Sequence, residues 1–219
     1  MKKVLIFNGS PRKSGNTSAL INEFINGCKT NNAYIELFNT HELNIDYCRG
    51  CLRCNVLGKC SNQNDEWQVI ADKMFNFDVI VFASPVYFHH VTASMKKLID
   101  RFRSFINVQI TEDGLIHTPY KTWNAEIVLV LVMGSPDKAE ADPVIDMFRF
   151  IQSFMSPGKE LHVITGTRLA VSGQVLMSDE KLSQLYNKMK ISQHLIQHDL
   201  TNNNYLLQQC FRSGVELTV

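Results

Sequence analysis

The chain has 219 residues, of which 45% are hydrophobic and 20% charged, an ordinary globular composition that predicts a single domain with one substantial core. Lys and Arg total 22 against 21 Asp and Glu, so the chain lacks the basic excess that nucleic-acid-binding proteins show. No stretch reaches the roughly 18 apolar residues of a membrane helix, and the four apolar residues that follow Lys3 are too few for a signal-peptide core. We therefore expect a cytoplasmic protein that binds neither nucleic acid nor membrane.

Five short apolar segments predict β-strands, and they alternate with helical patterns along the chain. The predicted strands are residues 3–7, 34–38, 78–84, 127–133 and 161–165. The predicted helices begin at residue 16 and then cover about 65–75, 91–106, 143–155 and 179–198, while the turn signals in 107–125 predict a small hairpin. This alternation predicts an α/β domain over residues 1–200, with a parallel sheet covered by helices on both faces, and a C-terminal extension over 201–219.

The loop that follows the first strand is rich in groups that bind phosphate. Gly9–Ser18 contains two glycines, four hydroxyl residues and two cations directly before a helix. Free backbone N–H groups and the positive end of the helix dipole favour an anion at such a position. The alternative is a polar turn capped by Ser14 or Asn16. The loop lacks the Gly-Lys-Ser/Thr ending of a Walker loop and the Gly-x-Gly-x-x-Gly pattern of dinucleotide-binding folds.

Two further loops are expected at the same edge of the sheet. Residues 84–90, Ser-Pro-Val-Tyr-Phe-His-His, follow the third strand, and Gly134-Ser-Pro136 follows the fourth. Parallel sheets bind ligands beyond the carboxyl ends of their strands, so these loops are predicted to share a site with Gly9–Ser18. For Tyr87 and Phe88 the alternative is packing in the core, since aromatic side chains mostly pack.

Four of the six cysteines lie within thirteen residues, in what we call the cysteine loop (residues 48–60). Their pattern is Cys48-x2-Cys51-x2-Cys54-x5-Cys60, on the long connection between the second strand and the helix over 65–75, and we expect the loop at the ligand-binding edge of the sheet. In a reducing compartment such a cluster indicates metal binding or redox chemistry rather than structural disulfides. The compact spacing favours an iron-sulfur cluster over zinc. Reduced thiols, a redox-active disulfide and zinc are the alternatives.

Three motifs together give the chain a family resemblance. They are Gly-Ser-Pro-Arg-x-x-Ser-Gly-Asn-Thr from Gly9, Ser-Pro-Val-Tyr-Phe from Ser84, and Lys-x-x-Ile-Asp-Arg ending at Arg101. Over about residues 1–170 the sequence resembles the NAD(P)H-dependent FMN reductases of the flavodoxin-like superfamily, and its four clustered cysteines resemble those of the iron-sulfur flavoprotein branch. The resemblance implies a flavodoxin-like three-layer sandwich with strand order 2-1-3-4-5, and a homodimer or homotetramer.

The resemblance also implies two cofactors and the residues that hold them. An FMN phosphate would be bound by the first loop, through Ser10, Arg12, Ser14, Asn16, Thr17 and Ser18. The isoalloxazine would lie against Pro85, Val86, Tyr87, Phe88, Gly134 and Ser135. A [4Fe-4S] cluster would be held by Cys48, Cys51, Cys54 and Cys60. From their position between these cysteines, Arg49 and Arg53 would offset its negative charge; the alternative is that both are surface residues.

The expected activity is that of an FMN-dependent oxidoreductase, a flavin or quinone reductase that takes electrons from NADH or NADPH. No side chain is expected to act as a catalytic acid or base, because the flavin carries the chemistry. Electrons are expected to leave for a small-molecule or protein acceptor, and to pass through the cluster if the cysteines hold one. The alternative is a flavodoxin-like electron carrier or redox sensor that turns over no small substrate. The sequence leaves open the choice between NADH and NADPH and the identity of the acceptor.

Overall fold

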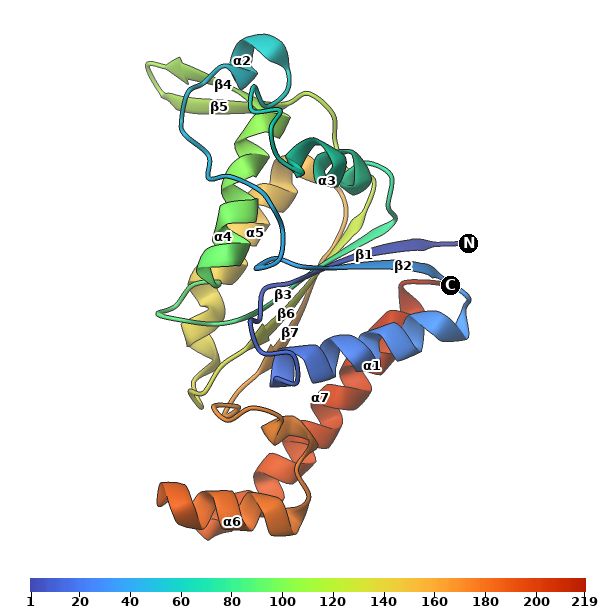
Figure 1. The fold of residues 1–219 in the computed structure, drawn as a ribbon, viewed down its shortest axis with the longest axis vertical. Helices are drawn as coiled ribbons and strands as arrows, with labels where there is room; N and C mark the ends of the chain where they lie inside the picture. Colours follow the sequence, from blue (N-terminus) through green and yellow to red (C-terminus); the bar gives the residue numbers. More distant parts are fainter.

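A computed structural model describes all 219 residues, and its centre is a five-stranded parallel sheet (Figure 1). The strands are β1 (Lys3–Asn8), β2 (Tyr34–Asn39), β3 (Val79–Pro85), β6 (Glu126–Val132) and β7 (Leu161–Gly166). They lie in the order β2-β1-β3-β6-β7, and every neighbouring pair is parallel. The predicted flavodoxin-like fold and its strand order are confirmed.

The central strands are buried on both faces because their sequences are almost unbroken apolar runs. Alternate side chains of one strand enter two different cores: Ile80 and Phe82 of β3 belong to one apolar cluster, and Val79 and Val81 belong to the other. Helices α1 and α7 cover one face of the sheet, and α3, α4 and α5 cover the other (Figure 1).

The helices mostly match the predicted segments, and their bounds are as follows. They are α1 (Asn16–Thr30), α2 (Cys54–Leu57), α3 (Trp67–Met74), α4 (Ala93–Asp100), α5 (Asp142–Met155), α6 (Asp179–Met189) and α7 (Ile196–Glu216). Helix α4 continues as a 3₁₀ turn, η1 (Arg101–Phe105). No helix is both long enough and apolar enough to cross a lipid bilayer.

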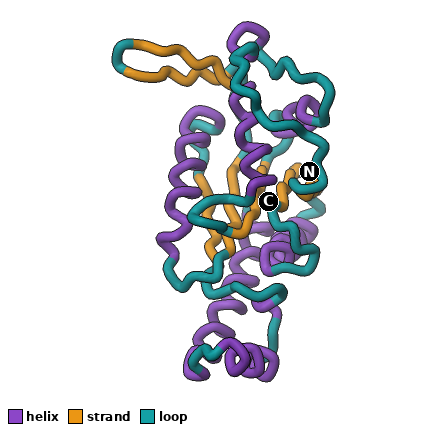
Figure 2. The backbone as a smooth tube through the Cα atoms, turned by 60° about the vertical axis from the view of Figure 1, so that its left-hand side comes forward, coloured by secondary structure: helices purple, strands orange, loops and turns teal.

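The predicted hairpin is present between residues 107 and 125. Strands β4 (Ile106–Thr111) and β5 (Gly114–Pro119) pair antiparallel as a separate two-stranded sheet. The hairpin projects from the body of the protein beside α2 (Figure 2). It is joined to α2 by two hydrogen bonds, from the Asn55 amide to the Val108 carbonyl (3.1 Å) and from the Val108 N–H to the Asn55 side chain (3.2 Å).

The C-terminal part differs from the sequence prediction. The prediction of a single helix over 179–198 is wrong. Helix α6 ends at Met189, because the next residue, Lys190, is left-handed with a φ of +57°, and a new helix begins at Ile196. Helix α7 runs across residue 200, where the extension was expected to start, and packs on α1. Cys210, a residue of α7, is fully buried in the apolar cluster between this helix and the sheet.

Two glycines allow α1 and α7 to cross at very short range. A β-carbon added to Gly27 would lie 2.0 Å from the Phe211 carbonyl oxygen, and one added to Gly214 would lie 2.1 Å from the Phe24 carbonyl oxygen. Real β-carbons do not approach other atoms this closely. The backbones of the two helices therefore touch, and only glycine fits at either position.

A buried polar cluster fixes the start of α7 to the loop that follows β7. The Nε of Arg168 donates to both carboxylate oxygens of Asp199 (2.9 and 2.8 Å), and the Tyr186 hydroxyl and the His198 Nδ1 also contact this carboxylate. Burial would raise the pKa of Asp199, but hydrogen bonds from Tyr186, Arg168 and His198 outweigh it and hold the pKa below its usual value. Burial and Asp199 raise the pKa of Tyr186 to about 12.

Replacing Asp199 by asparagine should lower the free energy of unfolding at pH 7 by about 2 kcal/mol, because it removes charge-assisted hydrogen bonds. The folded pKa of Asp199 lies below the unfolded value of about 3.9, so its contribution is complete above that pH and disappears as the pH falls through the folded pKa. Urea unfolding of both proteins between pH 7 and 3 should show the difference shrinking below about pH 4. A difference that stays constant would contradict this.

Candidate cofactor and cysteine sites

The loops after β1, β3 and β6 meet at the carboxyl edge of the sheet, as predicted. The Gly9 N–H donates to the Ala83 carbonyl (2.7 Å), and the Val86 N–H donates to the Val132 carbonyl (2.8 Å). Thr92, the N-cap of α4, joins two of the loops: its hydroxyl donates to the Gly9 carbonyl (2.8 Å) and its N–H to the Ser84 hydroxyl (3.1 Å). The sequence prediction missed Thr92, although a threonine directly before a helical pattern is an N-cap signal.

The N-terminus of α1 presents unpaired backbone donors at this meeting point. Its N-cap is Gly15, which has no side chain to cap the helix, and the first intrachain hydrogen bond of the helix is from Ala19 to Gly15. The N–H groups of Asn16, Thr17 and Ser18 have no acceptor within the chain. Three convergent N–H groups at the positive end of a helix dipole form an anion-binding position.

The predicted phosphate-binding residues have different roles in this loop. Ser10 is buried, and its hydroxyl accepts from the Arg12 N–H (3.3 Å), while the Ser18 hydroxyl donates to the Arg12 carbonyl (3.1 Å). Ser14 is exposed and Thr17 is buried. The Arg12 guanidinium is exposed and donates to the Ala170 carbonyl (3.3 Å). Ser10, Arg12 and Ser18 therefore make hydrogen bonds within the chain that hold the loop before α1 in place.

Asn16 has a structural role that the sequence did not reveal. Its amide nitrogen donates to the carbonyls of Leu169 (3.0 Å) and Val171 (2.8 Å), and its side-chain oxygen accepts from the Val175 N–H (3.0 Å). The Asn16 side chain is thus fully occupied in fastening the segment after β7 to α1. Of this residue, only the backbone N–H is free for a ligand.

The loop after β3 turns sharply and carries an exposed aromatic side chain. Tyr87 and His90 pair through two backbone hydrogen bonds (2.8 and 3.0 Å), and the two residues between them, Phe88 and His89, have φ of +48° and +60°. Such angles are unfavourable by about 1–2 kcal/mol per non-glycine residue. Phe88 is 102% exposed, so packing in the core is excluded for it. Pro85 ends β3, and Val86 is half-buried.

Gly134 and Ser135 lie beside the segment that follows β7. The Ser135 carbonyl accepts from the Arg168 N–H (2.9 Å), and a β-carbon on Gly134 would lie 3.2 Å from that of Ala170. The strand-ending turn is therefore in contact with the same segment that Asn16 and Arg12 hold.

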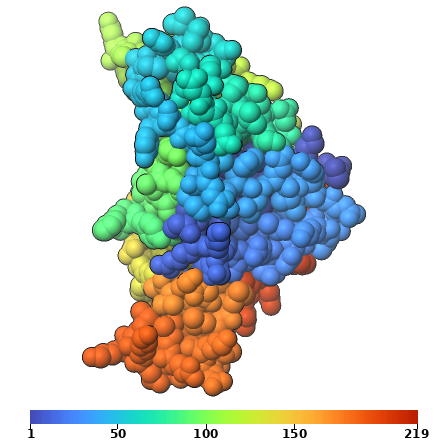
Figure 3. All heavy atoms as spheres, in the orientation of Figure 1, coloured from blue at the N-terminus to red at the C-terminus, as the bar shows by residue number.

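The cysteine loop lies away from the carboxyl edge of the sheet, beside the turn that follows α4, so the expectation that it belongs to the ligand-binding edge of the sheet is wrong. Its four cysteines line one cavity of about 410 Å³, whose walls include Arg101, Arg103 and Ser104 of η1. These residues follow the C-terminal end of α4, whereas Thr92 at its beginning contacts the loops after β1 and β3. Figure 3 shows the light-blue to teal residues of this region at one extremity and the orange C-terminal residues at the other.

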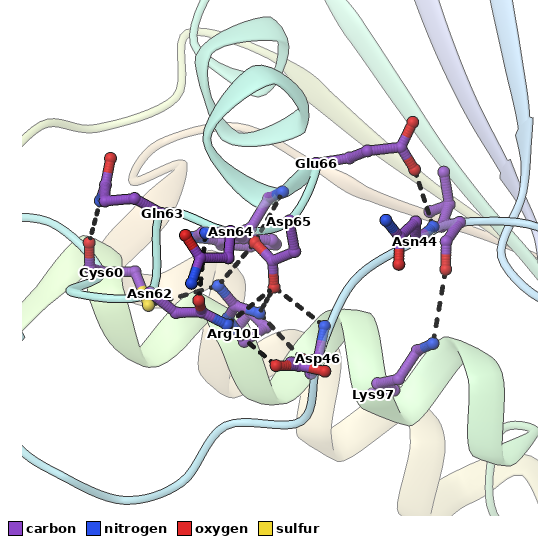
Figure 4. Close-up of polar contacts among 12 residues, drawn as sticks. Asn44, Asp46, Cys60, Asn62, Gln63, Asn64, Asp65, Glu66, Lys97 and Arg101 are labelled. Carbon is purple, nitrogen blue, oxygen red and sulfur yellow. Dashed lines mark hydrogen bonds and ion pairs between the residues drawn. The ribbon is translucent and has the colours of Figure 1, made fainter.

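Arg101 holds together the two arms of the cysteine loop, which are the segments just before and after it at residues 44–46 and 65–66 (Figure 4). Its side chain is 1% exposed, and its Nη1 donates to the Asp65 carboxylate (2.5 Å) and to the Asp46 carbonyl (2.8 Å). The guanidinium also lies over the Trp67 ring, 5.2 Å from its centroid. Burial would raise the pKa of Asp65, but hydrogen bonds from Arg101 and from the backbone N–H groups of Asp46 and Trp67 outweigh it and lower the pKa.

The two arms are also paired directly where the chain enters and leaves the loop. The Glu66 N–H donates to the Asn44 carbonyl (3.0 Å), and the Asn44 N–H donates to the Glu66 carboxylate (2.7 Å). The Asp46 N–H donates to the Asp65 carboxylate (2.9 Å). The two arms therefore lie side by side (Figure 4).

Two guanidinium groups contact cysteine sulfurs, and they are not the predicted ones. Nη2 of Arg101 lies 3.3 Å from Cys60 Sγ, and Nη1 of Arg103 lies 3.5 Å from Cys54 Sγ. Arg49 is exposed and pairs with Asp46 on the surface (3.0 Å). The sequence spacing pointed to arginines between the cysteines, whereas the fold supplies arginines from η1.

The thiols share a cavity, but in this structure their side chains do not converge on one point. All six cysteines are free, and no group of three or more His, Cys, Asp or Glu side chains is arranged to hold a metal ion. Burial raises the pKa of Cys54, opposed by Arg103, while hydrogen bonds from the Arg53 N–H and from Ser61 lower the pKa of Cys51. Four thiols that line one cavity, with guanidinium groups at two of the sulfurs, have the chemistry of a thiolate-ligated metal centre, although their sulfurs are not grouped as such a centre requires.

Known relatives are similar to this chain over nearly half of its length. An iron-sulfur flavoprotein of Clostridioides difficile (strain 630) is 38% identical over 100 residues, which are 45% of this chain and 44% of that protein. An iron-sulfur flavoprotein of Methanocaldococcus jannaschii is 37% identical over 101 residues, 46% of this chain and 52% of that protein. The aligned part of the chain spans about half the length of each of these relatives.

Solved structures share the fold over the whole chain. An FMN-dependent NADH-azoreductase from Bacillus anthracis, solved with FMN, has a TM-score of 0.66 at 12% identity, with 100% of both chains covered. An NAD(P)H:quinone oxidoreductase from Methanothermobacter marburgensis has a TM-score of 0.62 at 13% identity, covering 99% of this chain and 98% of that chain. The sequence profile of the NADPH-dependent FMN reductases matches residues 2–163. With the five-stranded parallel sheet and the three convergent loops, this match shows that the chain belongs to the NADPH-dependent FMN reductase family.

Proposed function

We propose that the chain is an FMN-dependent oxidoreductase that takes electrons from NADH or NADPH and passes them to a small-molecule or protein acceptor. The observation that carries this proposal is the set of three unpaired N–H groups at the start of α1, placed where the loops after β1, β3 and β6 meet. Membership of the family and the FMN bound in the azoreductase of the same fold support it.

In this proposal the chain positions the flavin and supplies no acid or base. The phosphate is held by the N–H groups of Asn16, Thr17 and Ser18, with Ser10, Ser14 and Arg12 around it. Pro85, Val86, Tyr87 and Phe88 border the isoalloxazine on one side, and Gly134 and Ser135 on another. When bound, FMN supplies both two-electron and one-electron chemistry.

Replacing Ser18 by aspartate should weaken FMN binding by about tenfold or more and change riboflavin binding much less. A carboxylate in the first turn is compatible with the helix dipole, so the fold should be kept, but it repels the dianionic phosphate. Fluorescence titration with both flavins measures the ratio of the two dissociation constants. Ser18→Asn, which keeps the size without the charge, is the control. Equal losses for FMN and riboflavin would contradict a phosphate position at α1.

Steady-state oxidation of NADH and NADPH by the FMN-loaded protein, with a quinone as acceptor, tests the activity itself. Turnover is the expected result, and the ratio of kcat/KM for the two nucleotides gives the preference. Tight FMN binding with no turnover would instead favour the electron carrier or redox sensor.

We further propose that Cys48, Cys51, Cys54 and Cys60 hold a [4Fe-4S] cluster. Support comes from their common cavity, from the arginine contacts to Cys54 and Cys60, and from relatives that are iron-sulfur flavoproteins. Such a cluster supplies a one-electron centre. Protein prepared without oxygen should contain about four iron and four sulfide per chain, and Cys60→Ser should contain clearly less. Zinc, or no metal at all, would overturn the assignment.

We infer that the protein works as a homodimer or homotetramer. Within one protomer the cysteine cavity and the flavin edge lie at opposite ends of α4. The path from Thr92 to Ser104 spans about 20 Å, at roughly 1.5 Å per residue in α4 and about 2.0 Å per residue in the 3₁₀ turn η1. In the inferred assembly, the cysteine cavity of one protomer lies nearer the flavin edge of the other protomer than that of its own chain. Sedimentation equilibrium of the loaded protein should show a dimer or tetramer, and a monomer at micromolar concentration would contradict the inference.

A further inference from the structure

A second cavity adjoins the cysteine-lined one, with which it shares Cys60 and Ser104. It has a volume of about 440 Å³ and is enclosed by residues 58–60, α3, η1 and the chain that leaves the hairpin. This volume is in the range of small-molecule sites. The loops after β1, β3 and β6 contribute nothing to its walls, so the proposed flavin site does not account for it.

Flat apolar side chains form much of the wall of this cavity. Trp67, Phe75, Phe105 and Tyr120 line it from three different segments. The Trp67 and Phe105 rings stack with centroids 5.3 Å apart, and Phe75 meets Phe105 edge to face at 5.0 Å. Trp67 and Phe105 are 1% and 5% exposed and form a rigid, buried floor. The half-buried Phe75 ring and the Tyr120 ring, which is 42% exposed, present the open aromatic surface, and this surface favours a planar aromatic ligand.

The polar part of the lining is biased toward positive charge. Lys59 and Lys121 both line the cavity, both are exposed, and neither is ion-paired with a carboxylate. Lys121 Nζ lies 5.2 Å from the centroid of the Phe75 ring, which places a cation against the aromatic wall. Asp72 is the one acidic residue of the lining, and its carboxylate accepts from the Gln68 amide (2.9 Å).

We propose that this cavity binds a planar aromatic anion. The rings supply stacking area, and the two unpaired lysines match an acidic substituent at the edge of the ligand. Cys60 lines both cavities, so the occupant lies against a residue of the cysteine loop. Proximity to a metal centre rests on the proposed function, whereas binding in the cavity does not.

Calorimetric titration of the FMN-saturated protein with naphthalene-2-sulfonate tests the site. We expect a single site with a dissociation constant between about 0.1 and 1 mM. Lys121→Met should weaken it about tenfold, and naphthalene-2-sulfonamide, which has the same shape without the charge, should bind the wild type about tenfold more weakly. Lys121→Arg should keep most of the affinity.

Two controls separate this site from the rest of the protein. Lys181→Met, on α6, removes an equivalent cation outside the cavity and should leave sulfonate binding unchanged. Ser18→Asp, titrated without FMN, should still bind the sulfonate, so that a failure of the proposed flavin site would not be mistaken for a failure here. No saturable binding up to 10 mM (roughly −2.7 kcal/mol), or equal affinities of wild type and Lys121→Met, would overturn the proposal.

Discussion

Alanine at position 27 should destabilise the protein by about 3 kcal/mol, although alanine is intrinsically better than glycine in a helix by up to about 1 kcal/mol. The reversed sign follows from the crossing of α1 and α7, where the new β-carbon would lie 2.0 Å from the Phe211 carbonyl oxygen. That oxygen belongs to the backbone and cannot rotate away. The helices must therefore separate, and they lose contact over the buried residues on either side of the crossing.

Urea unfolding followed by circular dichroism measures the effect. Asn204→Ala, at an exposed position of α7 about two turns before Phe211, is the matched control and should change the free energy of unfolding by less than about 0.5 kcal/mol. Gly214→Ala should resemble Gly27→Ala, and the double variant should cost less than the sum, because one separation of the helices relieves both clashes. A Gly27→Ala protein as stable as the wild type would show that the helices do not touch.

Replacing Arg101 by methionine should cost about 3–5 kcal/mol of folding free energy. Methionine keeps much of the volume but leaves the carboxylate of Asp65, itself 4% exposed, without its cation. It also removes the donor to the Asp46 carbonyl, so both arms of the cysteine loop lose their common attachment. The cysteine loop should then be cut by protease faster than the rest of the chain.

Arg149→Met is the matched control, since Arg149 forms an exposed pair with Asp146 (3.0 Å) that should contribute less than about 1 kcal/mol. The double variant Arg101→Met, Asp65→Asn should recover part of the loss, because no unpaired charge remains buried. Equal stabilities of the Arg101 and Arg149 variants would contradict the role assigned to the buried pair.

The parallel sheet could be predicted because each strand carries its own signal. Val79–Ala83 and Ile127–Val132 are uninterrupted apolar runs, and both are buried on the two faces of the sheet. The convergence of Gly9–Ser18 with the loops after β3 and β6 follows from topology alone. These features depend on local sequence and on general rules of chain connection.

Contacts between distant segments could not be predicted in the same way. Nothing in the spacing of the four cysteines indicates that the cysteine loop lies against η1. Arg101 and Arg103 lie 41 and 49 residues beyond the cysteines that they contact. Arg49 and Arg53 lie between the cysteines, so local spacing favours them as the neighbouring cations. The break between α6 and α7 depends on Lys190 adopting a left-handed conformation, for which the sequence carries no glycine.

Because Asn44 pairs with Glu66, the cysteine loop is a segment that can be replaced without moving the chain on either side of it. Because the chain enters and leaves at neighbouring points, residues 47–63 are an excursion that begins and ends at one place on the scaffold. A short turn between Asp46 and Asn64 would close the same gap at little entropic cost. Lineages could therefore acquire, lose or exchange such a segment, and a designer could graft another metal-binding loop onto the same two anchors, without rebuilding the sheet.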